Sequence, residues 1–264
     1  MSASPRTVVL VQARQGSHRL PGKSLRPMAG YPMISHVLRR ARMIPGVSDV
    51  WLVTSVNQRD DQLAELGDSL GFSVFRGSEW DVLQRMTDAA RLSGADIVMR
   101  VTGDCPLLAP DVSGTVLRVF LENWPRRSYA SNDTERSGFP DGFDTEVFSA
   151  EILRICCERA LDRLDREHVT RWMRRELPAS DMVMVASTQD WSRVKLSVDT
   201  EEDFLRASMV MALLEGDMPE KANMQATALA ACRIGRAHVR ADWDPSMGLR
   251  IPEFPEVVVP RRPR

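Results

Sequence analysis

The sequence contains few of the covalent or metal-based features that stabilise small proteins. Among its 264 residues there are four cysteines, and none of them forms a CxxC pair: Cys105, Cys156, Cys157 and Cys232. A disulfide framework or a cysteine-based metal site is therefore not expected. Free thiols are typical of the reducing cytoplasm, and the adjacent Cys156 and Cys157 are interpreted as packing residues of a helix.

Long apolar runs and a net charge of one sign are also absent. No run approaches the roughly 20 apolar residues of a membrane span, and the apolar run at the N-terminus is too short for a signal peptide. The formal charge is −1, from 35 basic and 36 acidic residues. A cytoplasmic protein that binds neither membranes nor nucleic acid is therefore expected, and an anionic substrate would need a local group of cations.

Apolar runs alternate with helical patterns over the first hundred residues. Strands are predicted at residues 8–12, 50–54, 73–75 and 97–102, and helices at residues 33–43, 58–70 and 79–93. This order favours an α/β fold with a mostly parallel sheet. Ligands bind to such sheets beyond the carboxyl ends of the strands, where the loops after the first and fourth strands lie.

The pattern is less regular after residue 124. Strands are predicted at residues 146–149, 183–186 and 194–198, and helices at residues 150–162 and 165–176. DTEEDF, which begins at residue 199, has the form of a capped helix start. The last part of the chain, residues 235–264, is rich in proline and arginine and is predicted to be an irregular C-terminal arm.

The loop after the first strand combines cations with glycines. QARQGSHRLPGKSL, residues 12–25, contains Arg14, Arg19 and Lys23 beside Gly16 and Gly22. Glycines allow the backbone to approach a ligand closely, and free N–H groups beside several cations can bind a polyphosphate. The loop has neither the GxxxxGK[ST] nor the GxGxxG pattern. From composition alone, a solvated basic loop is an equally good interpretation.

Residues 12–41 carry a more specific signal. They read QARxxSxRLPGKxLxxxxGxPMIxHVLRRA, which resembles the N-terminal signature of cytidylyltransferases that make CMP-activated sugar acids. That family includes CMP-KDO synthetases and acylneuraminate cytidylyltransferases, and its spore-coat-polysaccharide branch is the most similar. The resemblance implies that the loop binds the triphosphate of CTP. The positions that it assigns to nucleotide binding are Ala13, Arg14, Ser17, Arg19, Gly22 and Lys23, and Arg14 and Lys23 are also expected to be catalytic.

The resemblance also implies the domain organisation. Residues 1–264 are expected to form a single Rossmann-like nucleotidyltransferase domain with a mostly parallel central sheet. Residues 125–180 are expected to be an inserted element that binds the acceptor and mediates dimerisation.

Two aspartates stand where a hard cation could bind. Asp104 follows the fourth strand in RVTGDCPLL, and Asp199 precedes a helix in KLSVDTEEDF. Each has a structural alternative, a turn for Asp104 and a helix N-cap for Asp199. Magnesium prefers one or two carboxylates together with phosphate oxygens and water. The resemblance implies that Asp104 and Asp199 together bind Mg²⁺ and that Asp104 is catalytic.

The segment SNDTERSGFPDGFDTEVFS, residues 131–149, resembles a stretch of sugar nucleotidyltransferases that reads SN…PDG-D-E-FS. Carboxylates in this segment can accept hydrogen bonds from sugar hydroxyls. Asp144 and Glu146 are therefore predicted to contact the acceptor. PDG is also an ordinary turn sequence, so two interpretations of Asp141 stay open: contact with the acceptor and stabilisation of a turn.

A helix over residues 165–176 would place His168, Arg171 and Arg175 on one face. Such a cationic stripe suits an acidic acceptor, although a solvated basic face has the same pattern. The resembling branch has an EHVT element here that is associated with the acceptor and with subunit contacts. Arg171 stands where that branch often has proline, which leaves the acceptor open.

Two further segments contain acidic residues in patterns that occur in nucleotide-dependent transferases. RGSEWDVLQR, residues 76–85, resembles a family segment near the nucleotide, so Arg76 and Asp81 are expected to approach the base or ribose. Asp81 fits the first turn of a helix equally well. Asp242 and Asp244 form a DWD sequence of the kind found in glycosyltransferases, but their place in the tail gives them no assigned role.

The implied activity is the Mg²⁺-dependent transfer of CMP from CTP to an acidic acceptor such as a sugar acid, with release of pyrophosphate, by a homodimer. A phosphonate or another non-sugar acid is the alternative acceptor. A glycosyltransferase of similar architecture would carry DxD directly after a central strand, where GDC stands instead. In a non-catalytic nucleotide-binding protein we expect at least one of Lys23, Asp104 and Asp199 to be replaced, whereas all three are present. No cysteine has a base beside it, so no side-chain nucleophile is expected.

Overall fold

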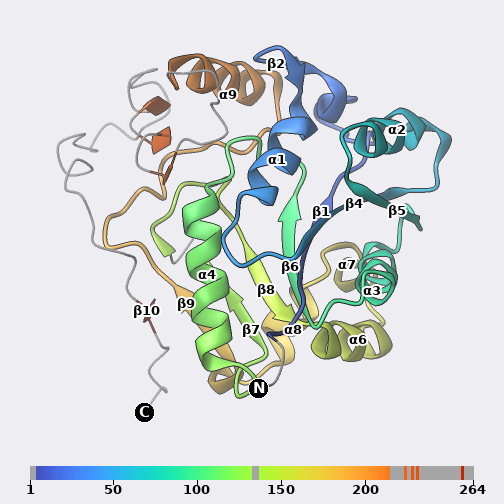
Figure 1. Ribbon diagram of the computed structural model, residues 1–264, viewed down its shortest axis with the longest axis vertical. Coiled ribbons are helices and arrows are strands. Elements are labelled where there is room, and N and C mark those ends of the chain that lie inside the picture. Colours follow the sequence, from blue (N-terminus) through green and yellow to red (C-terminus); the bar gives the residue numbers. More distant parts are fainter. Residues whose placement is uncertain are drawn as a thin grey trace.

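A central sheet organises the computed structural model, which describes residues 4–132, 137–214, 223–224, 227–228, 230–231 and 257–258. Within these residues the sheet has eight strands in the order β10-β9-β7-β8-β6-β1-β4-β5 (Figure 1). The strands are β1 (Thr7–Gln12), β4 (Asp49–Ser55), β5 (Ser73–Gly77), β6 (Ile97–Thr102), β7 (Tyr129–Ser131), β8 (Glu146–Ser149), β9 (Met182–Val185) and β10 (Val257–Val258). A separate two-stranded sheet joins β2 (Pro27–Met28) to β3 (Tyr31–Pro32).

The sheet is mostly parallel, as predicted. β1 pairs in parallel with both β4 and β6, and β4 pairs in parallel with β5. β8 runs antiparallel to its neighbours β6 and β7, and β10 runs antiparallel to β9. Residues Val8 to Val11 of β1 are completely buried, which explains why this strand reads as a continuous apolar run.

Helices cover both faces of the sheet. One apolar cluster joins the sheet to α1, α2, α4 and α9, and a second cluster joins the opposite face to α3, α6 and α8. Figure 1 shows α1 and α4 crossing in front of the strands. The helices are α1 (Met33–Arg42), α2 (Asp61–Ser69), α3 (Val82–Leu92), α4 (Pro110–Asn123), α6 (Ala150–Arg159), α7 (Arg163–Glu167), α8 (Arg171–Glu176) and α9 (Glu201–Leu213). Short 3-10 helices are η1 (Lys23–Leu25), η2 (Gln58–Asp60) and η3 (Ala179–Asp181).

The predicted strands and helices of the first hundred residues are all present. The sequence did not predict α4 or β7, and it predicted one helix where the structure has α7 and α8. Val169 interrupts that helix, because its φ is +53°, which is outside the helical range. The predicted strand at residues 194–198 is wrong, since this segment makes only an isolated bridge between Asp141 and Lys195.

Residues 125–180 supply β7, β8, α6, α7 and α8, so part of the expected insertion lies within the central sheet. Its assigned role in acceptor binding and dimerisation stays a prediction. The expected C-terminal arm lies outside the described residues except for Val257–Val258, and Cys232, Asp242 and Asp244 also lie outside them. Over the part of the chain that the structure describes, every helix is too short or too polar to cross a membrane.

The register of the parallel strands brings two loops to the same edge of the sheet. Gln12, the last residue of β1, pairs with Thr102, the last residue of β6. The basic loop after β1 and the loop that carries Asp104 therefore begin side by side. This edge is where ligands bind to open α/β sheets.

A tight contact fixes the turn at residues 140–144 against the segment that precedes α9. Gly142 has a φ of +103°, and a Cβ atom there would lie 2.7 Å from the backbone nitrogen of Ser197. We expect Gly142→Ala to lower the free energy of unfolding by about 2–4 kcal/mol, because the strained φ and the backbone clash add together. Urea denaturation would measure the loss.

Gly71→Ala is the matched control for this prediction. Gly71 also has a positive φ, +72°, but no atom lies within 4 Å of the added Cβ. Its loss should be limited to about 1–2 kcal/mol of backbone strain. Equal losses in the two variants would contradict the close approach at Gly142.

Candidate functional site

A pocket of about 280 Å³ lies at the carboxyl ends of β1 and β6. Its lining residues are Gln12, Ala13, Arg14, Gly16, Ser17, His18, Arg19, Lys23, Ser24, Thr102, Gly103 and Asp104. The pocket therefore brings together Asp104 and most of the loop residues that the sequence assigned to nucleotide binding.

Two glycines shape this pocket. A Cβ atom on Gly103 would lie 2.6 Å from the Cβ of Ala13 and 3.0 Å from the carbonyl oxygen of Gln12, so only glycine lets the two loops pack this closely. Gly22 does not line the pocket. It adopts a φ of +72° immediately before η1, and this turn directs Lys23 inward, where only 8% of the residue is exposed.

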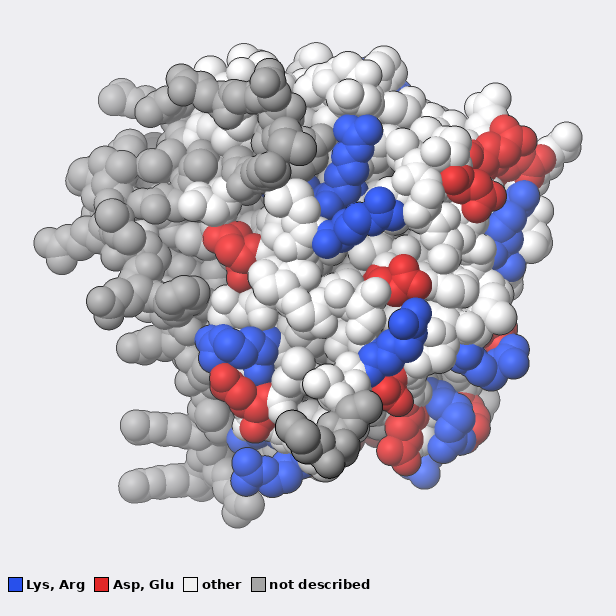
Figure 2. Space-filling model, viewed as in Figure 1, with Lys and Arg blue, Asp and Glu red and all other residues white. Residues whose placement is uncertain are grey.

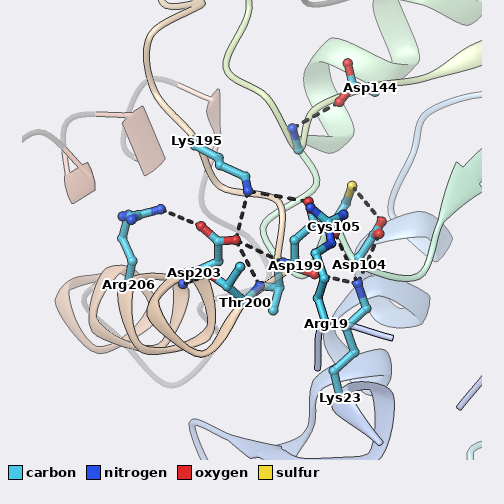
Figure 3. A network of polar contacts seen from close by, with 12 residues as sticks. Arg19, Lys23, Asp104, Cys105, Asp144, Lys195, Asp199, Thr200, Asp203 and Arg206 are labelled. Atoms are coloured by element: carbon cyan, nitrogen blue, oxygen red, sulfur yellow. Dashed lines mark hydrogen bonds and ion pairs between the residues drawn. The ribbon is translucent and has the colours of Figure 1, made fainter. Parts of the chain in front are cut away.

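The Lys23 ammonium lies between two carboxylates that are far apart in the sequence. Its Nζ lies 3.3 Å from Oδ2 of Asp104 and 3.6 Å from Oδ1 of Asp199, and it donates a 2.5 Å hydrogen bond to the carbonyl oxygen of Val198. The guanidinium of Arg19 lies 2.8 Å from the same Oδ1 of Asp199. Figure 3 shows these side chains converging from the first loop, from the end of β6 and from the start of α9.

This convergence affects how nearby carboxyl groups titrate. Desolvation works to raise the pKa of Asp104, but the charge of Lys23 and hydrogen bonds from Thr102 and Lys23 outweigh it and lower the pKa. Desolvation raises the pKa of Asp141, and the charges of Asp199 and Asp104 raise it further against the opposing effects of Ser197 and Lys195. Asp141 is therefore close enough to the predicted metal ligands to respond to their charge.

The donor chemistry fits a magnesium ion. Asp104 and Asp199 offer hard oxygen ligands, and both already lie within 3.6 Å of a single cationic nitrogen. Among the described residues there is no group of three or more His, Cys, Asp or Glu side chains that could hold a metal ion. Magnesium does not need one, since one or two carboxylates with phosphate oxygens and water are its usual ligands in nucleotide sites.

Glu146 is buried and is not among the residues that line this pocket. Its carboxylate lies 2.5 Å from the guanidinium of Arg100 and accepts a 2.6 Å hydrogen bond from the hydroxyl of Tyr129. Desolvation works to raise the pKa of Glu146, but the charges of Arg100 and Arg174 outweigh it and lower the pKa. Glu146 thus has two internal partners, and its contact with an acceptor stays a prediction.

Asp144 accepts a 3.1 Å hydrogen bond from the backbone of Gly142, and Figure 3 shows it apart from the pair Asp104 and Asp199. The thiol of Cys105 lies 3.7 Å from Oδ1 of Asp104. Burial raises the pKa of its thiol well above the usual value, with a further contribution from Asp104. The Cys105 thiol therefore stays protonated, which makes it a poor nucleophile.

His168, Arg171 and Arg175 do not form one helical stripe, because the chain bends at Val169. His168 is exposed at the end of α7. Arg171 and Arg175 both bind the carboxylate of Asp165, with shortest distances of 2.9 Å and 2.8 Å. The hydrogen bond from Arg175 is the main cause that lowers the pKa of Asp165.

Arg76 and Asp81 do not line the pocket. Arg76 donates to the carbonyl oxygens of Ser55 and Asn57 and lies 2.6 Å from Asp61. Asp81 caps α3 by accepting a hydrogen bond from the backbone of Gln84. Asp81 also binds the guanidinium of Arg166 through both carboxylate oxygens, at 2.9 and 2.5 Å.

Sequence reasoning missed several residues that contact the predicted site. The guanidinium of Arg14 donates to the carbonyl oxygen of Glu79 at 3.3 Å and lies 3.7 Å from the carboxylate of Glu167. Lys195 lies 3.4 Å from Asp199. Both glutamates stand in segments that the sequence singled out, Glu79 in residues 76–85 and Glu167 in the EHVT element, but neither was assigned a role. The spacing of Lys195 and Asp199 gave no signal, because the sequence predicts a strand rather than a helix at residues 194–198.

Charge on the face of the molecule seen in Figure 2 is mixed. Figure 2 shows Lys and Arg side chains interspersed with Asp and Glu on the face in view. The concentration of cations in the loop after β1 is therefore a local feature, as the balanced composition required.

Comparison with known proteins identifies the family. A family model for cytidylyltransferases matches residues 8–230. The chain belongs to the cytidylyltransferase family. It is thus a CTP-dependent nucleotidyltransferase, which confirms the resemblance found in residues 12–41 and favours it over the glycosyltransferase and non-catalytic alternatives.

Individual relatives agree with this assignment. A spore coat polysaccharide biosynthesis protein of Bacillus subtilis is 30% identical over 203 residues, which cover 74% of this chain and 82% of that protein. A 3-deoxy-manno-octulosonate cytidylyltransferase of Anaeromyxobacter sp. is 34% identical over 116 residues, 43% of this chain and 46% of that one. The solved structure of a cytidylyltransferase from Leptospira borgpetersenii has a TM-score of 0.82 at 26% identity and covers 95% of this chain and 100% of that chain.

The contacts of Glu146 give a stability prediction for this cytidylyltransferase. Glu146→Gln should lower the free energy of unfolding at pH 7 by about 3 kcal/mol, because it leaves Arg100 buried without its counter-ion. The folded pKa of Glu146 is below the ordinary value of 4.5. The ion-pair contribution is thus full above pH 4.5 and is lost as the pH falls through the folded pKa. Urea unfolding at pH 7 and pH 4 would measure the difference in the free energy of unfolding between the wild type and Glu146→Gln. This difference should be smaller at pH 4.

Glu122→Gln is the control, because Glu122 forms an exposed pair with Arg118. Its effect should stay below about 1 kcal/mol at either pH. A Glu146→Gln protein of normal stability with a raised KM for the acceptor would contradict the structural role and favour direct acceptor contact.

Proposed function

We propose that this cytidylyltransferase transfers CMP from CTP to an oxygen of a sugar acid in a Mg²⁺-dependent reaction that releases pyrophosphate. The observation that carries the proposal is the position of Lys23. Its ammonium lies within 3.6 Å of the carboxylates of both Asp104 and Asp199, beside the glycine-containing loop after β1. Cations for a triphosphate and carboxylates for a metal ion are thus available at one edge of the sheet.

The cations of the loop bind and orient the triphosphate. Arg14, Arg19 and Lys23 all line the same pocket, and backbone N–H groups near glycine can contribute further donors. These groups neutralise the charge that accumulates on the pyrophosphate leaving group. Fixed positive charge placed where negative charge develops stabilises a transition state without reorganisation.

Asp104 and Asp199 are the residues that would hold the metal. Mg²⁺ bound there would supply polarisation of the α-phosphate and a lower pKa for the attacking oxygen. In the chemical step the acceptor oxygen forms a bond to the α-phosphorus and gives up its proton. The bond from that phosphorus to the bridging oxygen breaks, and its electron pair leaves with pyrophosphate. The protein contributes mainly by positioning the reactants.

A sugar acid is the proposed acceptor because of the relatives that the chain resembles. One of them is a 3-deoxy-manno-octulosonate cytidylyltransferase, and another acts in spore coat polysaccharide biosynthesis. A phosphonate or another non-sugar acid is the alternative acceptor and forms an arm of the test below.

The proposal includes a homodimer formed through residues 125–180. Leu161 and Leu164 support it, since 92% and 48% of these apolar residues are exposed in the single chain. A cytoplasmic location is part of the same proposal and is supported by the free thiols of Cys105, Cys156 and Cys157.

Nucleotide and acceptor choice can be tested together. The protein would be incubated with Mg²⁺, each of CTP, UTP, ATP and GTP, and a panel of sugar acids, phosphonates and neutral sugars. We expect pyrophosphate release with CTP and a sugar acid, detected as a CMP conjugate by mass spectrometry. Equal rates with UTP would contradict the use of CTP, and turnover confined to phosphonates would replace the proposed acceptor.

Removing one proposed metal ligand should abolish most of the activity. Asp104→Asn is expected to lower kcat about 100-fold or more, because the metal contributes several kcal/mol of charge stabilisation and 1.4 kcal/mol corresponds to a factor of ten. Initial rates over a range of Mg²⁺ concentrations would measure the effect. Asp61→Asn is the control, since Asp61 pairs with Arg76 outside the pocket. Unchanged turnover in Asp104→Asn would remove Asp104 from the metal site.

A further inference from the structure

Asp203, in the first turn of α9, makes more contacts than a helix cap requires. A capping box joins it to Thr200: the Thr200 hydroxyl accepts from the backbone of Asp203, and Asp203 Oδ2 accepts from the backbone of Thr200 at 3.0 Å. The same Oδ2 also accepts from the backbone nitrogen of Asp199 at 3.1 Å and from Nζ of Lys195 at 2.8 Å. Oδ1 accepts from Arg206 at 2.9 Å. Only 6% of this side chain is exposed.

Lys195 connects this cap to the side chain of Asp199. Its Nζ lies 2.8 Å from Oδ2 of Asp203 and 3.4 Å from Oδ2 of Asp199. The Lys195 backbone lies on a fixed support, because its neighbours Val194 and Leu196 exchange backbone hydrogen bonds of 3.0 and 2.8 Å with Asp141. Figure 3 shows Lys195 reaching from this segment to both carboxylates.

The two carboxylate oxygens of Asp199 have different partners. Oδ2 lies beside Lys195, whereas Oδ1 lies 2.8 Å from Arg19 and 3.6 Å from Lys23. Lys23 in turn contacts Asp104. The oxygen that faces the other proposed metal ligand is therefore Oδ1, while Lys195 holds the opposite oxygen and Asp203 holds the backbone nitrogen of the same residue.

We propose that Lys195 and Asp203 are positioning residues that orient Asp199 toward the Mg²⁺ site; this inference rests on the proposed function. The Lys195–Asp203 pair contacts the proposed metal ligand Asp199 but does not line the pocket. It fixes the rotamer and backbone of a metal-binding carboxylate without contacting the substrate. Partners of this kind typically contribute 10–100-fold to metal affinity or activity.

A charge-neutral double variant separates orientation from charge. Lys195→Met alone would remove a positive charge near the metal and so would alter the attraction for a cation directly. Lys195→Met/Asp203→Asn removes a positive and a negative charge that lie 2.8 Å apart, so the net charge around the proposed metal site is unchanged. An asparagine side chain can still accept the backbone hydrogen bonds of Asp199 and Thr200, which preserves the helix cap, so the effect measured is the loss of the Lys195 contact with Asp199.

Two measurements test the proposal. Binding of Mn²⁺, a substitute for Mg²⁺ that is visible by electron paramagnetic resonance, would be titrated against the protein without nucleotide. The Mg²⁺ concentration that gives half-maximal pyrophosphate release from CTP would be determined separately. We expect both values to rise about 10–100-fold in the double variant, while the KM for the acceptor stays close to that of the wild type. Lys195→Arg, which keeps the charge and the donor, should restore most of the affinity.

Ser149→Ala is the matched control. Ser149 caps α6 by accepting a hydrogen bond from the backbone of Ile152, outside the pocket. Its loss should reduce thermal stability to an extent typical of a lost cap without changing either metal measurement. Weaker metal binding in this variant would show that general destabilisation is sufficient and would overturn the positioning role.

The outcomes distinguish this inference from the function on which it rests. A wild-type protein that releases pyrophosphate from CTP, with a double variant that binds Mn²⁺ equally well, would overturn the inference alone. A wild-type protein that neither binds Mn²⁺ nor uses Mg²⁺ would overturn the proposed metal site and this inference with it.

Discussion

The buried ammonium of Lys23 is the interaction on which the site depends. A buried cation is costly unless anionic or carbonyl oxygens surround it, and Lys23 is only 8% exposed. The carboxylates of Asp104 and Asp199 and the carbonyl oxygen of Val198 supply these oxygens. Satisfying one cation thus brings together the loop after β1, the end of β6 and the segment before α9.

The same contacts explain how the proposed site can exist before its ligands arrive. Lys23 and Arg19 neutralise the carboxylates of Asp104 and Asp199, which would otherwise repel each other. The carboxylates in turn neutralise the two cations that are proposed to bind phosphate. In the proposed reaction, phosphate oxygens would take the place of the carboxylates around Lys23, and Asp104 and Asp199 would then be available to hold the metal ion. Phosphate binding alone would leave the carboxylates of Asp104 and Asp199 without a cation, and metal binding alone would leave Lys23 without an anion. Nucleotide and metal should therefore favour each other's binding.

Much of the fold could be predicted because its first half is locally encoded. Buried parallel strands read as apolar runs, and the helices between them have clear periodicity. The segment at residues 194–198 shows where this reasoning fails. Leu196 and Val198 are buried and alternate with more polar residues as in a strand, yet the segment contacts the turn at Gly142 rather than a full neighbouring strand. The break at Val169 is equally hidden, because a β-branched residue rarely has a positive φ.

The candidate site was predictable only in part for a related reason. Arg14, Arg19 and Lys23 stand in one recognisable loop, whereas the approach of Asp199 to Asp104 depends on the path of the chain between them. Lys195 and Asp199 are four residues apart, but they do not lie on a helix, so their spacing alone does not predict contact. Contacts that cross between segments need the fold, even where each residue type is already suspected.

The interpretation of Arg171 differs most between the sequence and the structure. Arg171, which stands where the resembling branch often has proline, raised the possibility of an unusual acceptor. In the structure Arg171 and Arg175 both bind Asp165, whose side chain is only 1% exposed. A buried carboxylate needs such counter-charges for the fold itself. Asp165 is therefore a sufficient reason for an arginine at position 171, and this residue no longer argues against a sugar acid.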